Sequence, residues 1–133
     1  MTTDQTEMLI NFQVARLVTK YNMSWDNGRF ADVASCFTED GVFVDATGYE
    51  NRGRAAIEAF GVKSLDLFGR MRHVTSNHVV SEEESGWRHQ CYMIFFSGLG
   101  LPSREIVSAR YDDEFIIGPD GPLFTIRRVL LDS

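Results

Sequence analysis

The sequence predicts an α+β fold in which helices pack on one face of a curved antiparallel sheet. Apolar residues in the first part of the chain recur at helical spacing, whereas those after Arg70 recur at every second position. Turn sequences separate the alternating segments, and the strongest is Gly-Pro-Asp-Gly-Pro at 118–122. Helices followed by hairpin-linked strands are typical of this fold class.

The first predicted element is a long amphipathic helix. We expect it to begin near Glu7, with Asp4 or Thr6 as its N-cap, and to end at Asn27-Gly28. Glycine after asparagine suits a left-handed residue that terminates a helix. The apolar positions recur every three or four residues and define one buried face: Ile10, Val14, Leu17, Val18, Tyr21 and Trp25.

Shorter elements follow the long helix. Residues 30–37 predict a short helix, 38–41 a turn and 42–45 a short strand. A third helix is expected to begin after residues 51–54. We expect Gly61 and Gly69 to interrupt it, so that residues 63–69 form a separate helical turn.

Four strands are predicted in the second half, over residues 71–82, 86–97, 104–117 and 123–131. Strict alternation places His73 on the same face as Thr75 and Asn77, and directs His78 to the opposite face. Long strands rich in aromatic residues are expected to curl around the packed helix. The concave side would then form a ligand pocket.

Composition limits the possible functions. The 133 residues predict a single domain over 1–133, and 44% hydrophobic content supports a packed core. The net charge of −6 and the scattered basic residues argue against a nucleic-acid partner. The longest apolar run, residues 92–96, is too short to cross a membrane. The polar N-terminus predicts no signal peptide, and hence a cytoplasmic protein in which Cys36 and Cys91 are buried thiols.

Neither a metal nor a cofactor is predicted. If His78 points away from His73, the two imidazoles cannot share one ion, and His89 lies on another strand. No group of His, Cys, Asp and Glu has metal-ligand spacing in the sequence. The pair Gly98 and Gly100 lacks the third glycine and the following helix of a dinucleotide-binding turn.

Asp26 and His73 are the candidate catalytic residues. Taken singly, an acid at a helix end is usually solvated, and a strand histidine is usually a hydrogen-bonded structural residue. Brought together, the carboxylate would hold the imidazole Nδ1–H and leave Nε2 free to act as a base near neutral pH. The pair gains chemical meaning only if the fold makes the two residues meet.

Five segments, at residues 21–30, 43–45, 72–77, 110–115 and 124–128, resemble the SnoaL-like branch of the NTF2-like superfamily. The resemblance implies a cone: a curved sheet wrapped around the first helix, with a deep apolar pocket. Similar members include scytalone dehydratase and the hexachlorocyclohexane dehydrochlorinase. These place an Asp–His dyad where this chain has Asp26 and His73, and an arginine of the dehydrochlorinase corresponds to Arg128. By alternation, Arg128 would share a pocket-lining face with Phe124 and Ile126.

The resemblance predicts a cofactor-independent lyase or isomerase, of dehydratase or cyclase type, that acts on an apolar cyclic or polyketide-like substrate. One departure is that Trp25 and Ala46 stand where scytalone dehydratase has tyrosines. Tyr21 would either stabilise developing negative charge or serve as a core residue. Residues expected to contact substrate are Tyr21, Trp25, Asn77, Tyr92 and Phe124, of which Asn77 and Tyr92 have an equally good structural interpretation.

The alternative is a non-catalytic protein of the same fold, either a ligand-binding protein or a structural subunit of the kind found in ring-hydroxylating dioxygenases. Fold alone does not separate these functions. The separation of Asp26 and His73 does, because a structural subunit has no need of a close pair. The resemblance also implies a homodimer or homotrimer that packs through the sheet.

Overall fold

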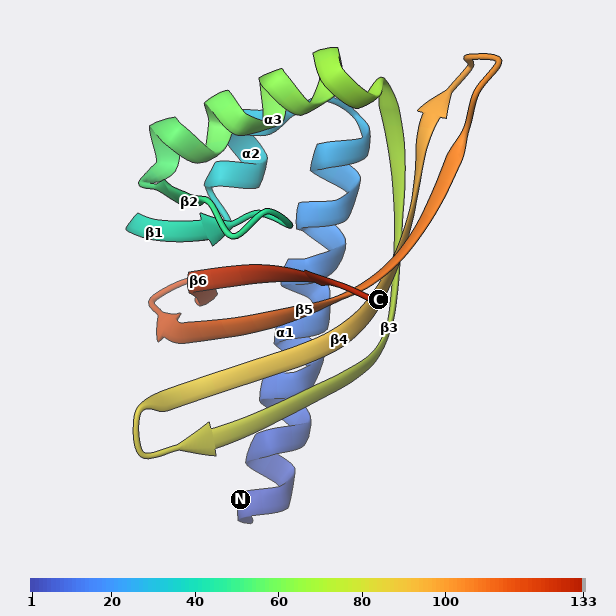
Figure 1. Cartoon of the computed structure of the whole chain (residues 1–133). Helices are drawn as coiled ribbons and strands as arrows, with labels where there is room; N and C mark the ends of the chain where they lie inside the picture. Colours follow the sequence, from blue (N-terminus) through green and yellow to red (C-terminus); the bar gives the residue numbers. More distant parts are fainter. Residues whose placement is uncertain (133) are drawn as a thin grey trace.

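The computed structural model describes residues 1–132 and contains a long helix, two shorter helices and six strands (Figure 1). The predicted α+β class is confirmed. The elements follow one another along the chain in this order: α1 (Thr3–Asp26), α2 (Phe30–Ala34), β1 (Phe37–Val44), β2 (Glu50–Arg52), α3 (Arg54–Phe68), β3 (Arg70–Glu83), β4 (Gly86–Leu99), β5 (Glu105–Gly118) and β6 (Gly121–Leu131).

The six strands form one curved sheet that does not close, in the order β2-β1-β6-β5-β4-β3. Neighbouring strands run antiparallel except β1 and β6, which are parallel. The parallel β1–β6 pair is the one departure from the predicted antiparallel sheet. The hairpin between β5 and β6 fixes the direction of β6, and β1 and β6 lie far apart in the chain with no hairpin between them, so this pair is free to be parallel.

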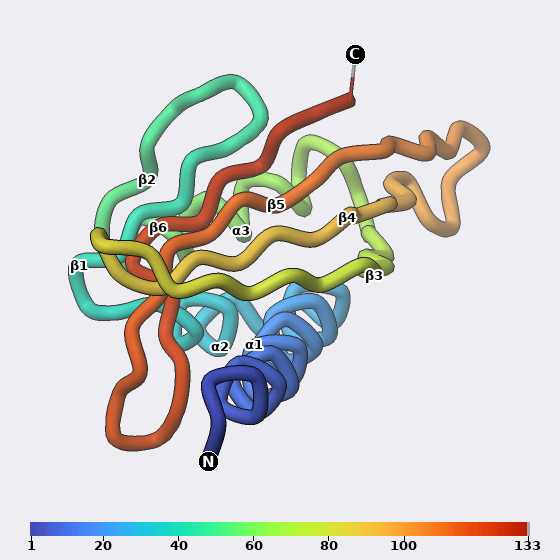
Figure 2. Tube along the Cα trace, turned by 90° about the horizontal axis from the view of Figure 1, so that it is seen from below, coloured from blue at the N-terminus to red at the C-terminus, as the bar shows by residue number. Residues whose placement is uncertain are grey.

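Helix α1 packs on one face of this sheet, as Figure 2 shows in a view close to the helix axis. It begins at Thr3, earlier than predicted, because Thr2 rather than Asp4 or Thr6 is the N-cap. The Thr2 hydroxyl accepts a hydrogen bond from the Gln5 N–H, and the Gln5 side chain accepts one from the Thr2 N–H. The helix ends as predicted, with Gly28 in the left-handed region at φ +72°.

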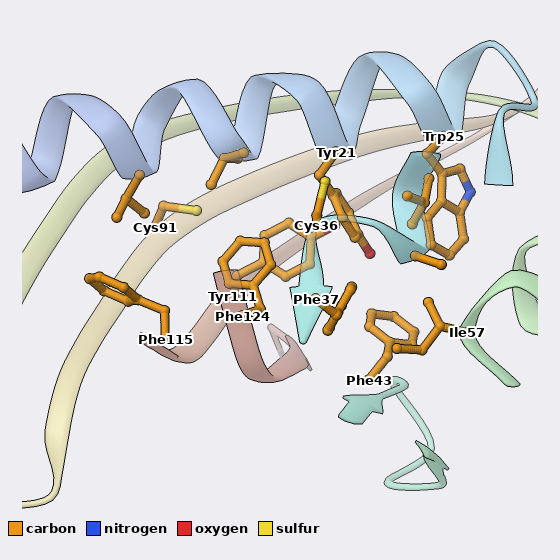
Figure 3. Close-up of a cluster of buried hydrophobic side chains, with 14 of the residues drawn as sticks. Tyr21, Trp25, Cys36, Phe37, Phe43, Ile57, Cys91, Tyr111, Phe115 and Phe124 are labelled. Carbon is orange, nitrogen blue, oxygen red and sulfur yellow. The ribbon is translucent and has the colours of Figure 1, made fainter. Parts of the chain in front are cut away.

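The apolar face of α1 covers a core made largely of aromatic side chains (Figure 3). Tyr21 is its centre, with ring centroids 5.6 Å from Trp25, 5.9 Å from Tyr111 and 6.3 Å from Phe37. Tilted and edge-to-face pairs at these distances are favourable beyond the area they bury. The core therefore joins α1 to β1 and β5.

Helix α3 runs unbroken through Gly61, contrary to the predicted interruption. Close packing requires a glycine here, because a Cβ at this position would lie 2.3 Å from Cδ1 of Phe30. Gly61 therefore lets α3 approach α2 closely instead of ending the helix. Residues 38–41, predicted as a turn, belong to β1, whose register shifts between Phe37 and Val42.

Two irregularities in the ladders change which side chains face the core. In β3, Ser76 pairs with Tyr92 and Val79 with Gln90, so that Asn77 and His78 together oppose Cys91. Asn77 has φ +60° and is exposed. This bulge reverses the alternation, and His78 turns to the same side of the sheet as His73. The prediction that the two histidines face opposite ways is wrong.

The second irregularity lies in β6. Phe115 pairs with Phe124 and Glu114 with Ile126, which leaves Thr125 as an extra residue. Its hydroxyl donates a hydrogen bond to the Glu114 carbonyl. The extra residue shifts the alternation, so that Arg127 joins Phe124 on the buried face and Arg128 moves away from it.

Both cysteines are buried and free, as predicted. Burial raises the pKa of the Cys36 thiol to about 11. Among the helices of residues 1–132, none combines the length and apolar character needed to cross a membrane.

Candidate active site

Asp26 and His73 meet although they lie 47 positions apart in the sequence. The imidazole Nδ1 of His73 lies 2.7 Å from Oδ1 of Asp26. The backbone N–H of His73 also donates to the same carboxylate, at 3.1 Å from each oxygen. Because the carboxylate is an acceptor, Nδ1 carries the proton in this contact, and Nε2 is left with its lone pair.

The position of the carboxylate follows from the end of α1. Asp26 is the last residue of the helix, so its charge lies at the negative end of the helix dipole, and the last turn contains no basic residue. The three contacts with His73 offset the unfavourable interaction of the Asp26 carboxylate with the helix dipole. Beside it, Asn22 Nδ2 donates to Thr75 Oγ1 at 3.1 Å, which ties α1 to β3 one helical turn earlier. The dyad is therefore held by the packing of α1 on β3.

The imidazole of His73 lies between two aromatic rings. Phe95 stacks on it with centroids 5.8 Å apart and planes inclined by 27°, and the Trp25 ring approaches edge-on at 5.7 Å. The side chains of His73 and Asp26 are only 4% and 10% exposed. Such an environment fixes the ring orientation and excludes most water from the base.

A cavity of about 260 Å³ opens beside His73, between α1 and the concave side of the sheet. Its lining is predominantly apolar, as predicted for the pocket. His73 belongs to the lining, and since its Nδ1 is occupied by Asp26, Nε2 is the ring nitrogen available to a ligand. The side chains around the cavity come from α1, α3 and five strands or their connections, and the largest are Tyr21, Trp25, Phe43, Phe60, Phe68, Met71, Met93, Phe95 and Tyr111.

Few polar groups interrupt this lining. Hydroxyl groups come from Ser64, Ser97, Tyr21 and Tyr111, and carboxylates from Asp45 and Glu105; no lysine or arginine lines the cavity within residues 1–132. Burial raises the pKa of Tyr21 well above its ordinary value, and the neighbouring Tyr111 raises it further. The Tyr21 hydroxyl therefore stays protonated and can donate a hydrogen bond. This arrangement suits a neutral ligand better than an anionic one.

Of the five residues predicted to contact substrate, Tyr21 and Trp25 line the cavity. The other three lie elsewhere. Asn77 is the exposed residue of the β3 bulge, and Tyr92 is 61% exposed. Phe124 is fully buried within the core, where its ring packs on those of Tyr21 and Phe37. None of these three side chains lines the cavity.

Arg128 does not reach the cavity either. Its guanidinium forms an ion pair with Glu114 at 3.0 Å, and both side chains are about one-third exposed. The prediction that it shares a pocket-lining face with Phe124 fails because of the extra residue Thr125, which puts Arg127 in that place. Strict alternation along a strand cannot anticipate a bulge.

Arg127 is instead the buried arginine of this region. Its guanidinium carbon lies 3.5 Å from the ring centroid of Tyr111, 4.3 Å from that of Tyr21 and 4.5 Å from that of Phe124. Its Nε is 3.3 Å from Oδ1 of Asp113, in a charge contact that lacks hydrogen-bond geometry. Arg127 thus lies behind the two cavity-lining tyrosines, where its charge is held by three aromatic faces.

Sequence reasoning missed the residues that complete the cavity, chiefly Phe43, Phe60, Phe95 and Tyr111. Phe95 lies on β4, two positions after Met93. It pairs directly with His73 of β3. Both residues fall within the predicted strands 71–82 and 86–97. The β3 bulge shifts the register of this pair by one residue, so a count outward from the hairpin loop would place it wrongly.

Comparison with known proteins agrees with this architecture. The SnoaL-like domain family matches residues 7–128, and the chain belongs to that family. A search of curated protein sequences found no match. Among solved structures, a function-unknown protein from Mycobacterium tuberculosis is 21% identical with a TM-score of 0.88, over 100% of this chain and 78% of that one.

Two further structures define the fold class. An NTF2-like protein with a cystatin-like fold from Novosphingobium aromaticivorans is 19% identical, with a TM-score of 0.78 over 93% of this chain and 82% of that one. A putative scytalone dehydratase from the same organism is 17% identical, with a TM-score of 0.81 over 98% and 87%. The chain therefore has the NTF2-like fold, with its long helix and curved open sheet. At these identities the similarity concerns the fold alone.

Proposed function

We propose that the protein is a cofactor-independent lyase or isomerase that uses Asp26 and His73 for general acid–base catalysis. The observation that carries the proposal is the 2.7 Å contact between His73 Nδ1 and Asp26 Oδ1 beside an apolar cavity. A base and the group that orients it, within hydrogen-bond reach of each other, are the geometric signature of such a site. Membership of the SnoaL-like family and the fold shared with a putative scytalone dehydratase are compatible with it.

In the proposed step, Nε2 of His73 removes a proton from a substrate carbon next to a carbonyl group. The ring becomes an imidazolium ion, whose positive charge the Asp26 carboxylate stabilises. In a dehydration, the imidazolium returns this proton to the departing hydroxyl group, which leaves as water while the carbon–carbon double bond forms. In an isomerisation, the same proton returns to a different carbon. Both cycles restore the neutral base.

Negative charge that develops on the substrate carbonyl oxygen needs a hydrogen-bond donor. We assign this role to Tyr21, which lines the cavity and keeps its proton because burial raises its pKa. The alternative donor predicted from the sequence was Arg128, but its pairing with Glu114 lies outside the cavity. Arg127 supports Tyr21 from behind its ring, at 4.3 Å.

The cavity limits the substrate. Its volume of about 260 Å³ is just below the ~300–1,000 Å³ typical of small-molecule sites. A small neutral ring compound with one or two rings fits this volume better than a four-ring steroid or an extended polyketide chain. The absence of lysine and arginine from the lining, within the described residues, argues against carboxylate or phosphate substituents.

A non-catalytic ligand-binding protein remains the alternative function. The same cavity would bind a small apolar molecule whether or not it reacts. The dyad favours catalysis, since a binding protein gains nothing from a buried carboxylate that orients one imidazole. The two functions predict different behaviour when His73 is replaced: turnover is lost in one case, and only affinity changes in the other.

The test is a screen of neutral cyclic β-hydroxyketones, followed by ultraviolet absorbance as the conjugated enone forms. We expect His73→Ala to lower the rate about 10²–10⁴-fold, the usual contribution of a general base. The control is Arg128→Gln, which removes a charged side chain outside the cavity and should leave turnover unchanged. Equal turnover by the wild type and His73→Ala would refute the proposal, as would bound ligand that the wild type never converts.

We also propose that copies of the chain associate through the outer face of the sheet. Val74 and Ile94 pair directly there and are about half exposed, and the neighbouring Tyr92 and Ile106 are more exposed still. A group of exposed apolar side chains on paired strands often marks an interface. Ile94→Asp should convert a dimer or trimer to a monomer, as measured by light scattering. Val62→Asp, at an exposed position of α3, should leave the oligomer intact.

A further inference from the structure

A second group of histidine and cysteine side chains lies on the β3–β4 ladder, away from the cavity. The donor atoms of His78, His89 and Cys91 all lie within 4.8 Å of one another. His89 and Cys91 occupy alternate positions of β4 and therefore project from the same face, where they are 0% and 2% exposed. None of the three lines the cavity beside His73.

The β3 bulge is what brings His78 to this group. A regular ladder would place one residue opposite Cys91, but Asn77 and His78 both occupy that place. The left-handed conformation of Asn77 absorbs the extra residue and turns His78 inward. Its Nδ1 then lies 3.0 Å from Nε2 of His89, with the two rings stacked at 5.2 Å. Bulges that redirect a side chain in this way are frequent next to functional sites.

His89 is held in the orientation that a metal ligand requires. Its Nδ1 is 2.7 Å from Oδ2 of Asp113, and both side chains are fully buried. The carboxylate accepts the Nδ1 proton, which leaves the Nε2 lone pair directed toward His78 and Cys91. A carboxylate behind a histidine is the usual outer support of a metal-bound imidazole, where it fixes the tautomer and raises the basicity of the ligand.

The ligand types of the group suit a divalent cation of the zinc class. Asp113 and Arg127 form an ion pair, so their charges cancel. A Cys91 thiolate would add one negative charge, so that the bound site would carry a single positive charge within the core. Two imidazoles and one thiolate are ligands that zinc prefers, whereas magnesium and calcium prefer oxygen. His78 is only partly buried, which gives an ion a route from solvent.

We propose that His78, His89 and Cys91 bind a zinc-class divalent cation with three protein ligands and an open fourth position. The ion would join the two strands at the bulge. The site is separate from the Asp26–His73 dyad: along α1, Cys91 lies toward one end of the core and Trp25, which borders His73, toward the other (Figure 3). The function proposed for the dyad does not depend on it.

Cobalt(II) tests the site directly, because it enters zinc sites and reports its ligands by absorbance. The full chain, stripped with a chelator, is titrated with cobalt chloride. We expect one ion per chain, an intense near-ultraviolet band from thiolate coordination, and loss of this band on addition of zinc. His78→Gln and Cys91→Ser should weaken binding by more than the about 10–100-fold typical for loss of an outer partner. His73→Gln, which removes an imidazole of the same strand outside the group, should bind as the wild type does.

A thermal unfolding measurement accompanies the titration, because a replaced core residue can affect folding. Zinc should raise the unfolding temperature of the wild type and His73→Gln, and leave that of His78→Gln unchanged. His78 is partly exposed, so this variant retains the apolar core if Cys91→Ser does not fold. The proposal is overturned if the wild type shows no thiolate–cobalt band, or if His78→Gln binds cobalt as tightly as the wild type.

Discussion

The Asp26 carboxylate accepts hydrogen bonds from both the backbone and the ring of His73, so one side chain fixes the strand and the imidazole together. The ring contact is 2.7 Å and the two backbone contacts are 3.1 Å. A carboxylate that only oriented the ring would need the ring contact alone. The double contact joins the end of α1 to the start of β3, and any movement between the two elements would disturb the base.

Asp26→Asn should therefore impair the dyad while preserving side-chain size. One of the two carboxylate oxygens becomes an NH₂ group, and a donor then faces a donor on His73. The negative charge that stabilises the imidazolium ion is also lost. We expect the rate to fall about 10²–10⁴-fold, as for loss of the base itself. Nitrogen-15 NMR of the ligand-free protein should show loss of the single Nδ1–H tautomer of His73.

The control for this variant is Asp66→Asn, on the exposed side of α3. It makes the same chemical change away from the dyad, and both the rate and the His73 spectrum should match the wild type. An Asp26→Asn protein with the wild-type tautomer and full activity would show that the carboxylate has no role in orienting the ring.

Arg127 and Arg128 are neighbours in sequence, but their replacement should lower the stability of the protein by very different amounts. Arg127→Gln leaves the Asp113 carboxylate buried without its cation, and removes the guanidinium from three aromatic faces. Breaking a buried ion pair in this way costs about 3–5 kcal/mol. Arg128→Gln breaks a partly exposed pair with Glu114 and should cost about 0–1 kcal/mol. Urea unfolding of both variants measures the two values.

Equal losses in the two variants would contradict the assignment of Arg127 to the core. A loss confined to Arg128→Gln would also mean that Thr125 is not the extra residue of β6. The comparison thus tests the position of the bulge as well as the energetics of the arginines.

Local patterns predicted most of the fold, because helical and alternating periods are properties of short segments. The strands from β3 to β6 begin and end within a few residues of their expected bounds, and α1 ends where Asn27-Gly28 indicates. The short β2 and the parallel pairing of β1 with β6 were missed. Both depend on contacts between segments far apart in the chain, which no local pattern records.

The predictions for the candidate site were likewise correct in part. Asp26 and His73 were correctly expected to meet, but that expectation came from family resemblance and not from local physics. The errors over Arg128 and His78 have a single cause, since each assumed strict alternation across a bulge. Asparagine tolerates the left-handed conformation of Asn77, but one such residue does not show where a ladder shifts, and Thr125 has no residue type that indicates a bulge. The position of both bulges depends on the register of the neighbouring strand.

Gly61 offers a test of the packing between α2 and α3. Alanine is intrinsically better than glycine inside a helix, by about 1 kcal/mol. At this position, however, the new Cβ would lie 2.3 Å from a ring carbon of buried Phe30, which cannot swing away as a flexible chain would. We expect Gly61→Ala to destabilise the protein by about 1–3 kcal/mol, the usual cost of overpacking.

Glu58→Ala, at an exposed position of the same helix, should change the free energy of unfolding little. Phe30→Leu should remove part of the clash, so the double variant should lose less than the sum of the single losses. Strict additivity of the two substitutions would place Phe30 outside the contact.

Alkaline stability tests the burial of the two cavity-lining tyrosines. Burial disfavours the charged phenolate and raises the pKa of Tyr21 and of Tyr111 above the ordinary value of 10.0. In the unfolded chain both ionise near that value, so between the two values the unfolded state has lost protons that the folded state retains. The resulting stabilisation is complete below about pH 10 and is lost as the pH rises further, by at most about 1.4 kcal/mol per pH unit for each group.

Tyr111→Phe should therefore make the alkaline decline in unfolding free energy less steep, whatever its effect on stability at neutral pH. Tyr49→Phe is the matched control, because Tyr49 is 67% exposed and lies in the connection between β1 and β2. Its variant should show the wild-type slope. Because lysines and the two thiols ionise in all three proteins, only the difference in slope is informative. If Tyr111→Phe and Tyr49→Phe declined in parallel, Tyr111 would be accessible to water, and the cavity would be less enclosed than the packing of Tyr21, Tyr111 and Arg127 requires.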